Sequence, residues 1–510
     1  MSIPLQKRKL LPIFLLLAAI FYGAVLRLYH LGVQSYWMDE GYTALAVKIL
    51  RETGSSILPS GVQYHCALFC YPTTLLTYIF GENAFSLRLL AAVAGIVLIP
   101  VIYLLAKKMF NKHVALLSAF FISFSYWQIA WSRQARWYTL LTLFFWLSLY
   151  FFYSALYDRS HRQKKALLSA FFTLLAISTH PLGLLLPVIE LVWLTIDRNI
   201  LIILKNKFLN LATPHKTAVL LLSVAIFIWL SVKAMSLLSV ISLSYALPYY
   251  LSFYARHYWL FIVFLVIAIY VRPKHNIGAT GLLLLSVLVY LIPLAFFTDT
   301  IQYRYLFHIT PALFILGAAG IVYAVNALKK TVLKISLVGF VLFLFFFSYL
   351  TPPEGILQPQ TLYFLESDNI SSLPNRPYYS YTPQPNWTEA YAFVKTNMQK
   401  GAIVVSSHPH FTYLFLDEAG YWLPIDYLGN NPNRQAIPVL PTDRYVGAQT
   451  IPDLATLRSL AEAGNGYIIF DYQAWNGRVP ANTLAYIEQE LSLVFYEETN
   501  SYSKIWVYSF

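Results

Sequence analysis

Long apolar runs alternate with short polar segments over the first 350 residues of the chain. A membrane-spanning helix needs about 20 predominantly apolar residues, and about eleven runs approach that length. They cover residues 10–29, 86–106, 113–131, 137–157, 164–179, 181–196, 216–235, 257–271, 277–297, 305–327 and 331–350. We therefore predict an α-helical polytopic membrane protein with about eleven transmembrane helices. The run 68–80, "LFCYPTTLLTYIF", is shorter and contains a proline, so we predict an interfacial or re-entrant helix there.

The pattern changes after residue 350. Residues 351–385 are rich in proline and predict a linker. Beyond them, "GAIVVSS" and "GYIIFDY" are typical of buried strands, and "NWTEAYAFVKTNM" is typical of a helix that begins near Asn386 or Thr388. We predict three parts: a multi-span domain over 1–350 with a long first outer loop at 30–85, the linker, and a small α/β domain over 386–510.

Composition and charge exclude a soluble protein and set the expected orientation. The chain is 58% hydrophobic and 12% charged, with a mean hydropathy of +0.57, whereas soluble domains are about 25% charged. With the N-terminus inside, the inner segments hold 19 Lys and Arg residues and the outer ones before residue 351 hold 9. We therefore expect a multi-pass plasma or inner membrane protein with a cytoplasmic N-terminus. An odd number of spans places the C-terminal domain outside the cytoplasm.

The net charge of +13 does not indicate a nucleic-acid partner. Residues 351–510 are net acidic, so the excess of positive charge belongs to the membrane part, where it marks cytoplasmic loops. No small-residue cleavage site follows the first apolar run, so we expect a retained helix rather than a signal peptide.

Cys66 and Cys70 are the only cysteines, and both fall on the predicted outer side. A disulfide is allowed in that compartment. Two residues one helical turn apart are poorly placed for one, however, so we expect small apolar packing instead. Adding His65 suggests a metal site, but the ligand spacing of structural zinc sites is absent.

Ionisable side chains collect at the outer ends of the predicted helices. The set comprises Asp39, Glu40, His65, Arg88, Arg133, Arg136, His180, Arg256, His257 and Arg304. Ordinary loop charges and interfacial aromatic anchors would explain any one of them. Charged groups near a membrane are costly and usually face protein or a wet cavity, and the inner loops offer few acidic residues beyond Asp158 and Asp197. The whole set therefore predicts a site at the outer membrane surface.

The residue types suit group transfer from a lipid phosphate. A carboxylate can act as general base toward an attacking hydroxyl or amine, and arginine binds phosphate bidentately and stabilises it as a leaving group. The tail of a polyprenyl phosphate would stay in the bilayer while its head entered the site.

The same segments resemble a known family. "YWMDEGYTALA", "AFSLRLLAAVAGIVLIPVIYLLAKKMF", "SRQARWYTLLTL", "THPLGLLLP" and "RYLFHITPALFILGAAG" are similar, in this order, to motifs of GT-C fold glycosyltransferases. The likeness is to glycosyltransferase family 39, the protein O-mannosyltransferases, and to the lipid A aminoarabinose transferases. One stretch departs from the family: "YHCALFCYP" stands where many relatives have His-Pro-Pro-Leu.

The resemblance implies a function and functional residues. It implies transfer of a sugar from a polyprenyl-phosphate donor to an extracytoplasmic glycan, lipid or protein. Asp39 would be the catalytic base, and Glu40 would orient the acceptor, the base or a divalent metal ion. The resemblance assigns donor phosphate binding to Arg133, Arg136, Arg304 and Tyr305. Beyond what the resemblance implies, we expect that His65, Arg88, Tyr138, His180, Arg256 and His257 could line the site.

Two other classes of protein fit part of the pattern. A polyprenyl-lipid flippase or transporter would also be basic and span the membrane many times, but it should show two related halves and binding residues near the midplane. A membrane assembly factor without activity would explain the outer domain but not Asp39 beside Glu40. We therefore favour the glycosyltransferase.

Overall fold

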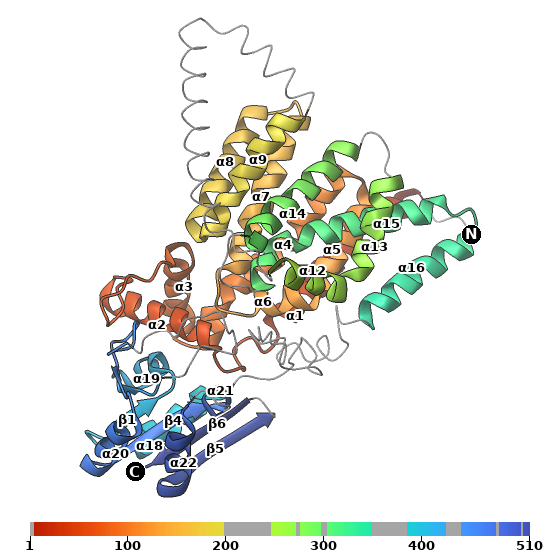
Figure 1. The fold of residues 1–510 in the computed structure, drawn as a ribbon. Helices are drawn as coiled ribbons and strands as arrows, with labels where there is room; N and C mark the ends of the chain where they lie inside the picture. The colour runs from red at the N-terminus through yellow and green to blue at the C-terminus, as the bar shows by residue number, and fades with distance from the viewer. Residues whose placement is uncertain are drawn as a thin grey trace, which may run out of the picture. The chain divides into compact units, whose positions relative to one another are not determined.

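The computed structural model describes residues 5–197, 246–271, 276–296, 303–347, 385–424, 440–475, 479–500 and 503–510. Within them, apolar helices precede a small mixed α/β domain, which confirms the predicted fold class (Figure 1). The predicted span 216–235 and nearly all of the linker lie outside the described residues.

Among the residues that the structure describes, five helical segments are long and apolar enough to cross a membrane. They are α1 (Leu5–Leu28), α4 (Ala84–Met109), α7 (Tyr138–Tyr157), α14 (Ile277–Phe296), and η3 (Tyr303–Ile309) continued by α15 (Thr310–Ala327). Two bent pairs raise the number to seven: α5 (Lys112–Phe124) with α6 (Tyr126–Ser132), bent by 56°, and α12 (Ala246–His257) with α13 (Trp259–Val271), bent by 91°. Shorter apolar helices are α3 (Ala67–Phe80), η1 (Pro181–Leu184) continued by α9 (Leu185–Ile196), and α16 (Thr331–Phe346). Helix α8 (Arg162–Thr179) has 18 residues and begins with charged side chains.

Every predicted span within the described residues coincides with a helix or a bent helix pair. The count of eleven stays a prediction, since 164–179, 181–196 and 331–350 form helices that are short or begin with charges. The predicted short helix at 68–80 is α3, with Pro72 inside it. The candidate spans differ in how much of their surface is buried. In the most apolar stretch of η3–α15, 94% of the residues are buried inside the protein, against 22% in α1. Helix α15 is therefore central, and α1 is suited to contact lipid.

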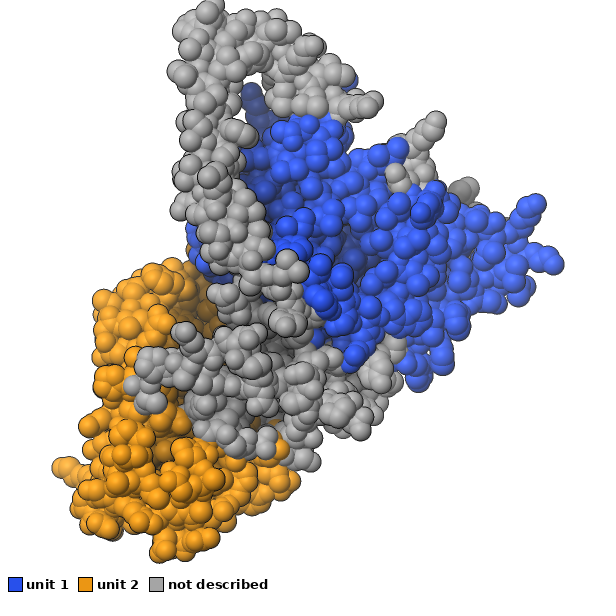
Figure 2. Space-filling view, in the orientation of Figure 1, with its two compact units in different colours: residues 1–23, 96–128, 140–353 blue, residues 24–95, 129–139, 354–510 orange. Residues whose placement is uncertain are grey.

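The described chain divides into two compact units (Figure 2). Unit 1 comprises residues 1–23, 96–128 and 140–353, and unit 2 comprises residues 24–95, 129–139 and 354–510. Unit 2 thus contains both the C-terminal α/β domain and the segment 30–85, which we predict to be the first outer loop and which carries helices α2 (Met38–Thr53) and α3.

The C-terminal domain is a six-stranded sheet with helices around it (Figure 1). The strand order is β3 (Gln449–Thr450), β2 (Tyr421–Trp422), β1 (Ile403–Ser406), β4 (Gly466–Asp471), β6 (Ser503–Ser509) and β5 (Ser492–Asn500). Its helices are α18 (Trp387–Asn397), α19 (Pro409–Leu416), α20 (Leu454–Ala463), α21 (Tyr472–Trp475) and α22 (Ala481–Glu490). Both predicted strands and the predicted helix are confirmed, and the Asn386 side chain caps α18 by accepting the Glu389 N–H.

Strands β1 and β4 lie at the centre because both are apolar on both faces. They pair in parallel, with Val405 opposite Ile468, and both residues are fully buried. The chain runs from β1 to β2 and β3 on one side, then returns to β4 on the other side of β1. The carboxyl ends of β1 and β4 therefore form a topological switch point, which is where open α/β sheets most often bind ligands.

Candidate functional site

Helix α2 carries the two adjacent carboxylates in its first turn. Trp37 is the N-cap, and its backbone N–H donates to Glu40 Oε2 at 3.1 Å. Asp39 and Glu40 also interact favourably with the positive end of the helix dipole. Gly54 ends the helix in the left-handed region, where its N–H reaches the Leu50 carbonyl. Asp39 is inside the helix, so its side chain is not the N-cap.

Glu40 forms a buried ion pair with Arg88. Arg88 Nε and Nη2 each lie 2.8 Å from a different oxygen of the carboxylate, and the Ala135 N–H donates to it at 2.6 Å. Both side chains are almost completely buried. Arg88 also donates to the carbonyls of Leu31, Gln34 and Ser35. The pair therefore fixes the loop that leads into α2.

Arg133 binds the end of α1. Its guanidinium donates to the carbonyls of Leu26, Arg27, Tyr29 and His30 at 2.8–3.2 Å. The last carbonyls of a helix lack partners within the helix, and a cation there also complements the helix dipole. Burial, helped by the neighbouring Arg88, lowers the pKa of Arg133 to about 9, so the side chain is cationic at neutral pH.

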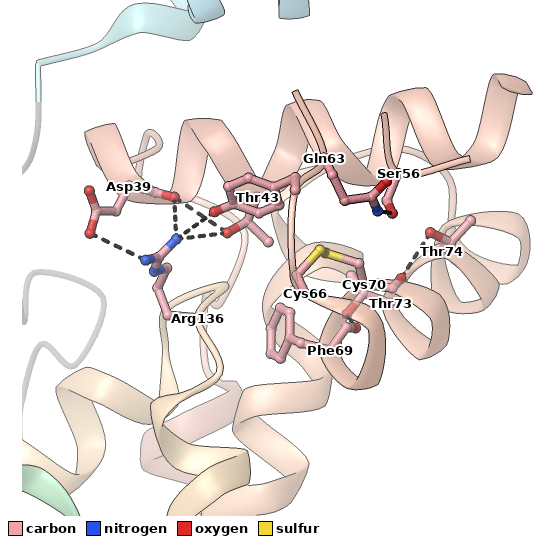
Figure 3. Close-up of a disulfide and its surroundings, with 11 residues drawn as sticks. Asp39, Thr43, Ser56, Gln63, Cys66, Phe69, Cys70, Thr73, Thr74 and Arg136 are labelled. Carbon is pink, nitrogen blue, oxygen red and sulfur yellow. Dashed lines mark hydrogen bonds and ion pairs between the residues drawn. A yellow bond between two sulfur atoms is a disulfide. The ribbon is translucent and has the colours of Figure 1, made fainter. Parts of the chain in front are cut away.

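Arg136 contacts Asp39 (Figure 3). Its Nη2 lies 3.4 Å from Asp39 Oδ2, and its Nη1 donates to the Asp39 carbonyl at 3.0 Å. Nη1 also reaches Thr43 Oγ1 at 3.2 Å and Tyr64 Oη at 3.0 Å. The guanidinium lies 3.8 Å from the centre of the Trp137 ring. Asp39 keeps 17% of its side chain exposed, so this carboxylate is both held in place and accessible.

Cys66 and Cys70 form a disulfide, so the expectation of simple apolar packing is wrong (Figure 3). The expectation assumed that both cysteines lie inside one helix. Cys66 is instead the N-cap of α3, with φ −141° and ψ 22°, and the two Cα atoms are 5.4 Å apart, within the range a disulfide spans. His65 beside it is exposed, whereas Tyr64 reaches Arg136. Tyr138 is buried against Trp131.

The remaining predicted residues belong to unit 1. His180 caps η1, where its Nδ1 accepts the Leu182 N–H at 3.2 Å, and its ring centre is 6.4 Å from that of Tyr305. The Arg304 guanidinium lies 5.9 Å from the centre of the Tyr305 ring. His257 is buried against Phe253 and Arg256 is exposed. Unit 1 thus groups His180, Arg304 and Tyr305.

Several residues near Asp39 were not predicted from the sequence. Thr43 and Tyr64 share Arg136 with it, and the C-terminal domain adds His410 and Tyr445, whose rings contact Tyr42. Burial raises the pKa of Tyr445, and the nearby Asp39 charge acts in the same direction. A sequence signal exists for His410: "SHPH", residues 407–410, directly follows the buried strand β1.

A divalent metal ion stays a prediction. Within the described ranges, no group of three or more His, Cys, Asp or Glu side chains is arranged to hold one. Arg88 already occupies the Glu40 carboxylate, and Arg136 faces that of Asp39.

Comparisons with known proteins agree with the fold. Residues 65–230 match the sequence model of a family described as dolichyl-phosphate-mannose-protein mannosyltransferase. An uncharacterised protein of Aquifex aeolicus (strain VF5) is 32% identical over 172 residues, which cover 32% of this chain and 34% of that protein. The chain therefore spans about a third of this relative.

Two kinds of solved structure cover nearly the whole chain. ArnT from Cupriavidus metallidurans in the apo state gives a TM-score of 0.61 at 13% identity, covering 99% of this chain and 98% of ArnT. ArnT bound to undecaprenyl phosphate gives 0.57 at 12% identity, with the same coverage. The Archaeoglobus fulgidus oligosaccharyltransferase AglB, in complex with an inhibitory peptide and a dolichol-phosphate, gives 0.58 at 13% identity, covering 98% of this chain and 74% of AglB. The chain is therefore an integral membrane protein of the GT-C fold that resembles glycosyltransferase family 39 and ArnT.

Proposed function

We propose that the protein is a glycosyltransferase that moves a sugar from a polyprenyl phosphate to an extracytoplasmic acceptor. The observation that carries the proposal is the accessible Asp39 carboxylate at the start of α2, held by Arg136 in a protein of the GT-C fold. Two similar structures contain undecaprenyl phosphate or dolichol-phosphate, which supports a lipid phosphate as the donor.

In the proposed reaction, an acceptor hydroxyl or amine attacks the anomeric carbon of the donor sugar. The bond from that carbon to the phosphate oxygen breaks, and polyprenyl phosphate leaves with the electron pair. Asp39 takes the proton of the attacking group as general base. A single displacement of this kind forms no covalent sugar–enzyme intermediate and inverts the anomeric configuration. The inversion is an inference from the family likeness.

The contacts favour different functions for the two acidic residues. Glu40 is fully buried and its oxygens are occupied by Arg88, the Trp37 N–H and the Ala135 N–H. It is therefore suited to hold the loop rather than to accept a proton. Asp39 is more exposed, with Arg136 facing one of its oxygens. Because Arg136 contacts Asp39, whereas Arg133 contacts carbonyls at the end of α1, Arg136 is better placed than Arg133 to act beside Asp39. Arg304 and Tyr305 remain the proposed ligands of the donor phosphate.

The proposal is tested by incubating the purified protein with a panel of polyprenyl-phosphate sugars and measuring release of polyprenyl phosphate. We expect Asp39→Asn to stay folded and bind donor while turnover falls about 100- to 10,000-fold, the usual share of general-base catalysis. Glu82→Gln is the matched control, because Glu82 is an outer carboxylate in an exposed pair with Arg51. Near wild-type turnover in folded Asp39→Asn would refute the base assignment.

A further inference from the structure

The C-terminal domain contacts the turn that carries Asp39. The ring of Tyr42 lies 4.0 Å from the ring of His410 and 4.2 Å from that of Tyr445, measured between centres. A Cβ atom added to Gly41 would lie 2.7 Å from His410 Nε2 and 2.6 Å from Phe411. Only glycine therefore lets α19 approach α2 this closely.

His410 contacts residues on both sides of Asp39. Besides Gly41 and Tyr42, the backbone of Met38 lies close enough to the ring to raise the pKa of His410, against the larger effect of burial. The side chain is 1% exposed. Burial, together with the neighbouring His408, lowers the pKa of His410 well below its usual range, so the ring is neutral and acts by contact rather than by charge.

The fold presents His410 on a rigid support. Strand β1 ends at Ser406 and α19 begins at Pro409, so His410 lies in the first turn of α19 at the switch point of the sheet. Ser406 Oγ accepts from the His408 N–H and from Tyr391 Oη, and the His408 ring pairs with Asp471 at 3.5 Å.

The other end of α19 is also fixed to α2. Lys48 Nζ donates to the Leu414 carbonyl at 2.9 Å and pairs with Asp417, which ends α19. Helices α2 and α19 are therefore joined at two places, through His410 near Asp39 and through Lys48 about two turns further along α2.

We propose that His410 is a positioning residue, which holds the turn from Met38 to Tyr42 so that the Asp39 carboxylate meets the acceptor in a reactive geometry. The switch point of an open α/β sheet often binds a ligand. In this protein, the switch point at the end of β1 instead fixes the turn that carries Asp39. The inference rests on the proposed function, because it needs Asp39 to act as the base.

The test combines His410→Ala and His410→Phe with Asp39→Asn and measures single-turnover rates at saturating donor. His410→Ala should lower the rate about 10- to 100-fold, the size expected for a misplaced reacting group, while donor affinity stays within about twofold because His410 is not among the proposed donor ligands. His410→Phe keeps an aromatic ring against Tyr42 and lacks only the ring nitrogens, so its loss of rate should be smaller. In the Asp39→Asn background, His410→Ala should have no further effect, because no base remains to be positioned.

Lys48→Gln is the matched control, since it weakens the same helix contact away from Asp39. It should lower the melting temperature and leave the rate per folded molecule near wild type. Equal losses for His410→Ala in both backgrounds, or an equal rate loss for Lys48→Gln, would overturn the positioning assignment.

Hydrogen–deuterium exchange separates failure of this inference from failure of the proposed function. Exchange in the segment 36–45 should rise in His410→Ala and change less in Lys48→Gln, whether or not a donor is known. Unchanged exchange in His410→Ala would overturn the positioning contact itself. If the wild type released no polyprenyl phosphate from any donor, the transferase proposal would fail while the exchange result still decided the contact.

Discussion

At the residue scale, adjacent carboxylates in one helical turn have different surroundings. Glu40 is completely enclosed, and Asp39 keeps part of its side chain exposed. Both stand side by side in "WMDEGY", and the residue pattern does not show this difference in burial, because it comes from Arg88 and Arg136, which are 48 and 97 residues away along the chain.

Removing the charge of Glu40 should affect stability before turnover. Glu40→Gln leaves the buried Arg88 without its counter-charge, and breaking a buried pair costs about 3–5 kcal/mol. We expect a large drop in melting temperature, with turnover per folded molecule close to wild type. The exposed Arg51–Glu82 pair is the comparison, because Glu82→Gln should cost less than about 1 kcal/mol. Equal melting temperatures for both variants would contradict this prediction.

Substitution of Arg304 tests whether unit 1 binds the donor phosphate. An arginine fork can bind a phosphate through two N–H groups, whereas lysine offers a point charge. Arg304→Lys should weaken donor use by about tenfold or more, given about 1.5–3 kcal/mol for a hydrogen bond to a charged group. Arg159→Lys is the control, because Arg159 is exposed in the same unit and is not among the candidate site residues. If donor kinetics were unchanged in Arg304→Lys, Arg136 or Arg133 would become the leading phosphate ligand.

At the element scale, the apolar pattern predicted helix positions well but not individual contacts. Apolar runs identify α4, α7 and α14 because spanning helices must be apolar along their whole length. The contact between α19 and α2 depends on Gly41 and His410, which are 369 residues apart and carry no periodic signal. The disulfide was missed for a local reason, since the start of α3 at Ala67 leaves Cys66 outside the helix.

Helices α7, α8 and α9 share a polar contact that the sequence analysis did not identify. Glu190 on α9 accepts from Ser148 on α7 at 2.7 Å and from Ser169 and Thr173 on α8 at 3.1 and 3.3 Å. Hydrogen bonds between helices in membranes average about 0.6 kcal/mol each. Glu190→Leu should therefore lower stability by about 1–2 kcal/mol, with a smaller loss for Glu190→Gln, which can still accept. Thermal unfolding measures this, with the exposed Leu191→Ala as control, and no loss in Glu190→Leu would contradict it.

The contact between α19 and α2 also predicts a pH dependence. The pKa of His410 is well below its usual range in the folded protein because the ring is buried. In the unfolded chain, a histidine takes up a proton below about pH 6.5, so the unfolded state binds more protons as the pH falls and stability decreases. The wild type should lose more stability than His410→Phe between pH 7.5 and 5.5. If thermal unfolding showed that the wild type and His410→Phe lose the same stability between these pH values, His410 would not be the cause of the pH dependence.

At the scale of the whole molecule, the proposed reaction depends on one topological expectation. Lys and Arg residues predict a cytoplasmic N-terminus and an outer side for both the first loop and the C-terminal domain. Unit 2 contains that loop and that domain together, so the two should face the same compartment. The disulfide between Cys66 and Cys70 also favours an oxidising compartment for the loop.

Two measurements on cells test this topology together. A reporter that matures only outside the cytoplasm should be active when fused after Phe510, and the same reporter fused before residue 10 should be inactive. In denatured protein from the same cells, where burial no longer protects them, the thiols of Cys66 and Cys70 should react with a maleimide only after reduction, because both are held in the disulfide. The Cys66→Ser variant is the control, since it leaves Cys70 free to react without reduction. If the reporter fused after Phe510 were inactive and the one fused before residue 10 active, Asp39 would lie on the wrong side for an extracytoplasmic acceptor. That result would contradict the proposed transfer reaction.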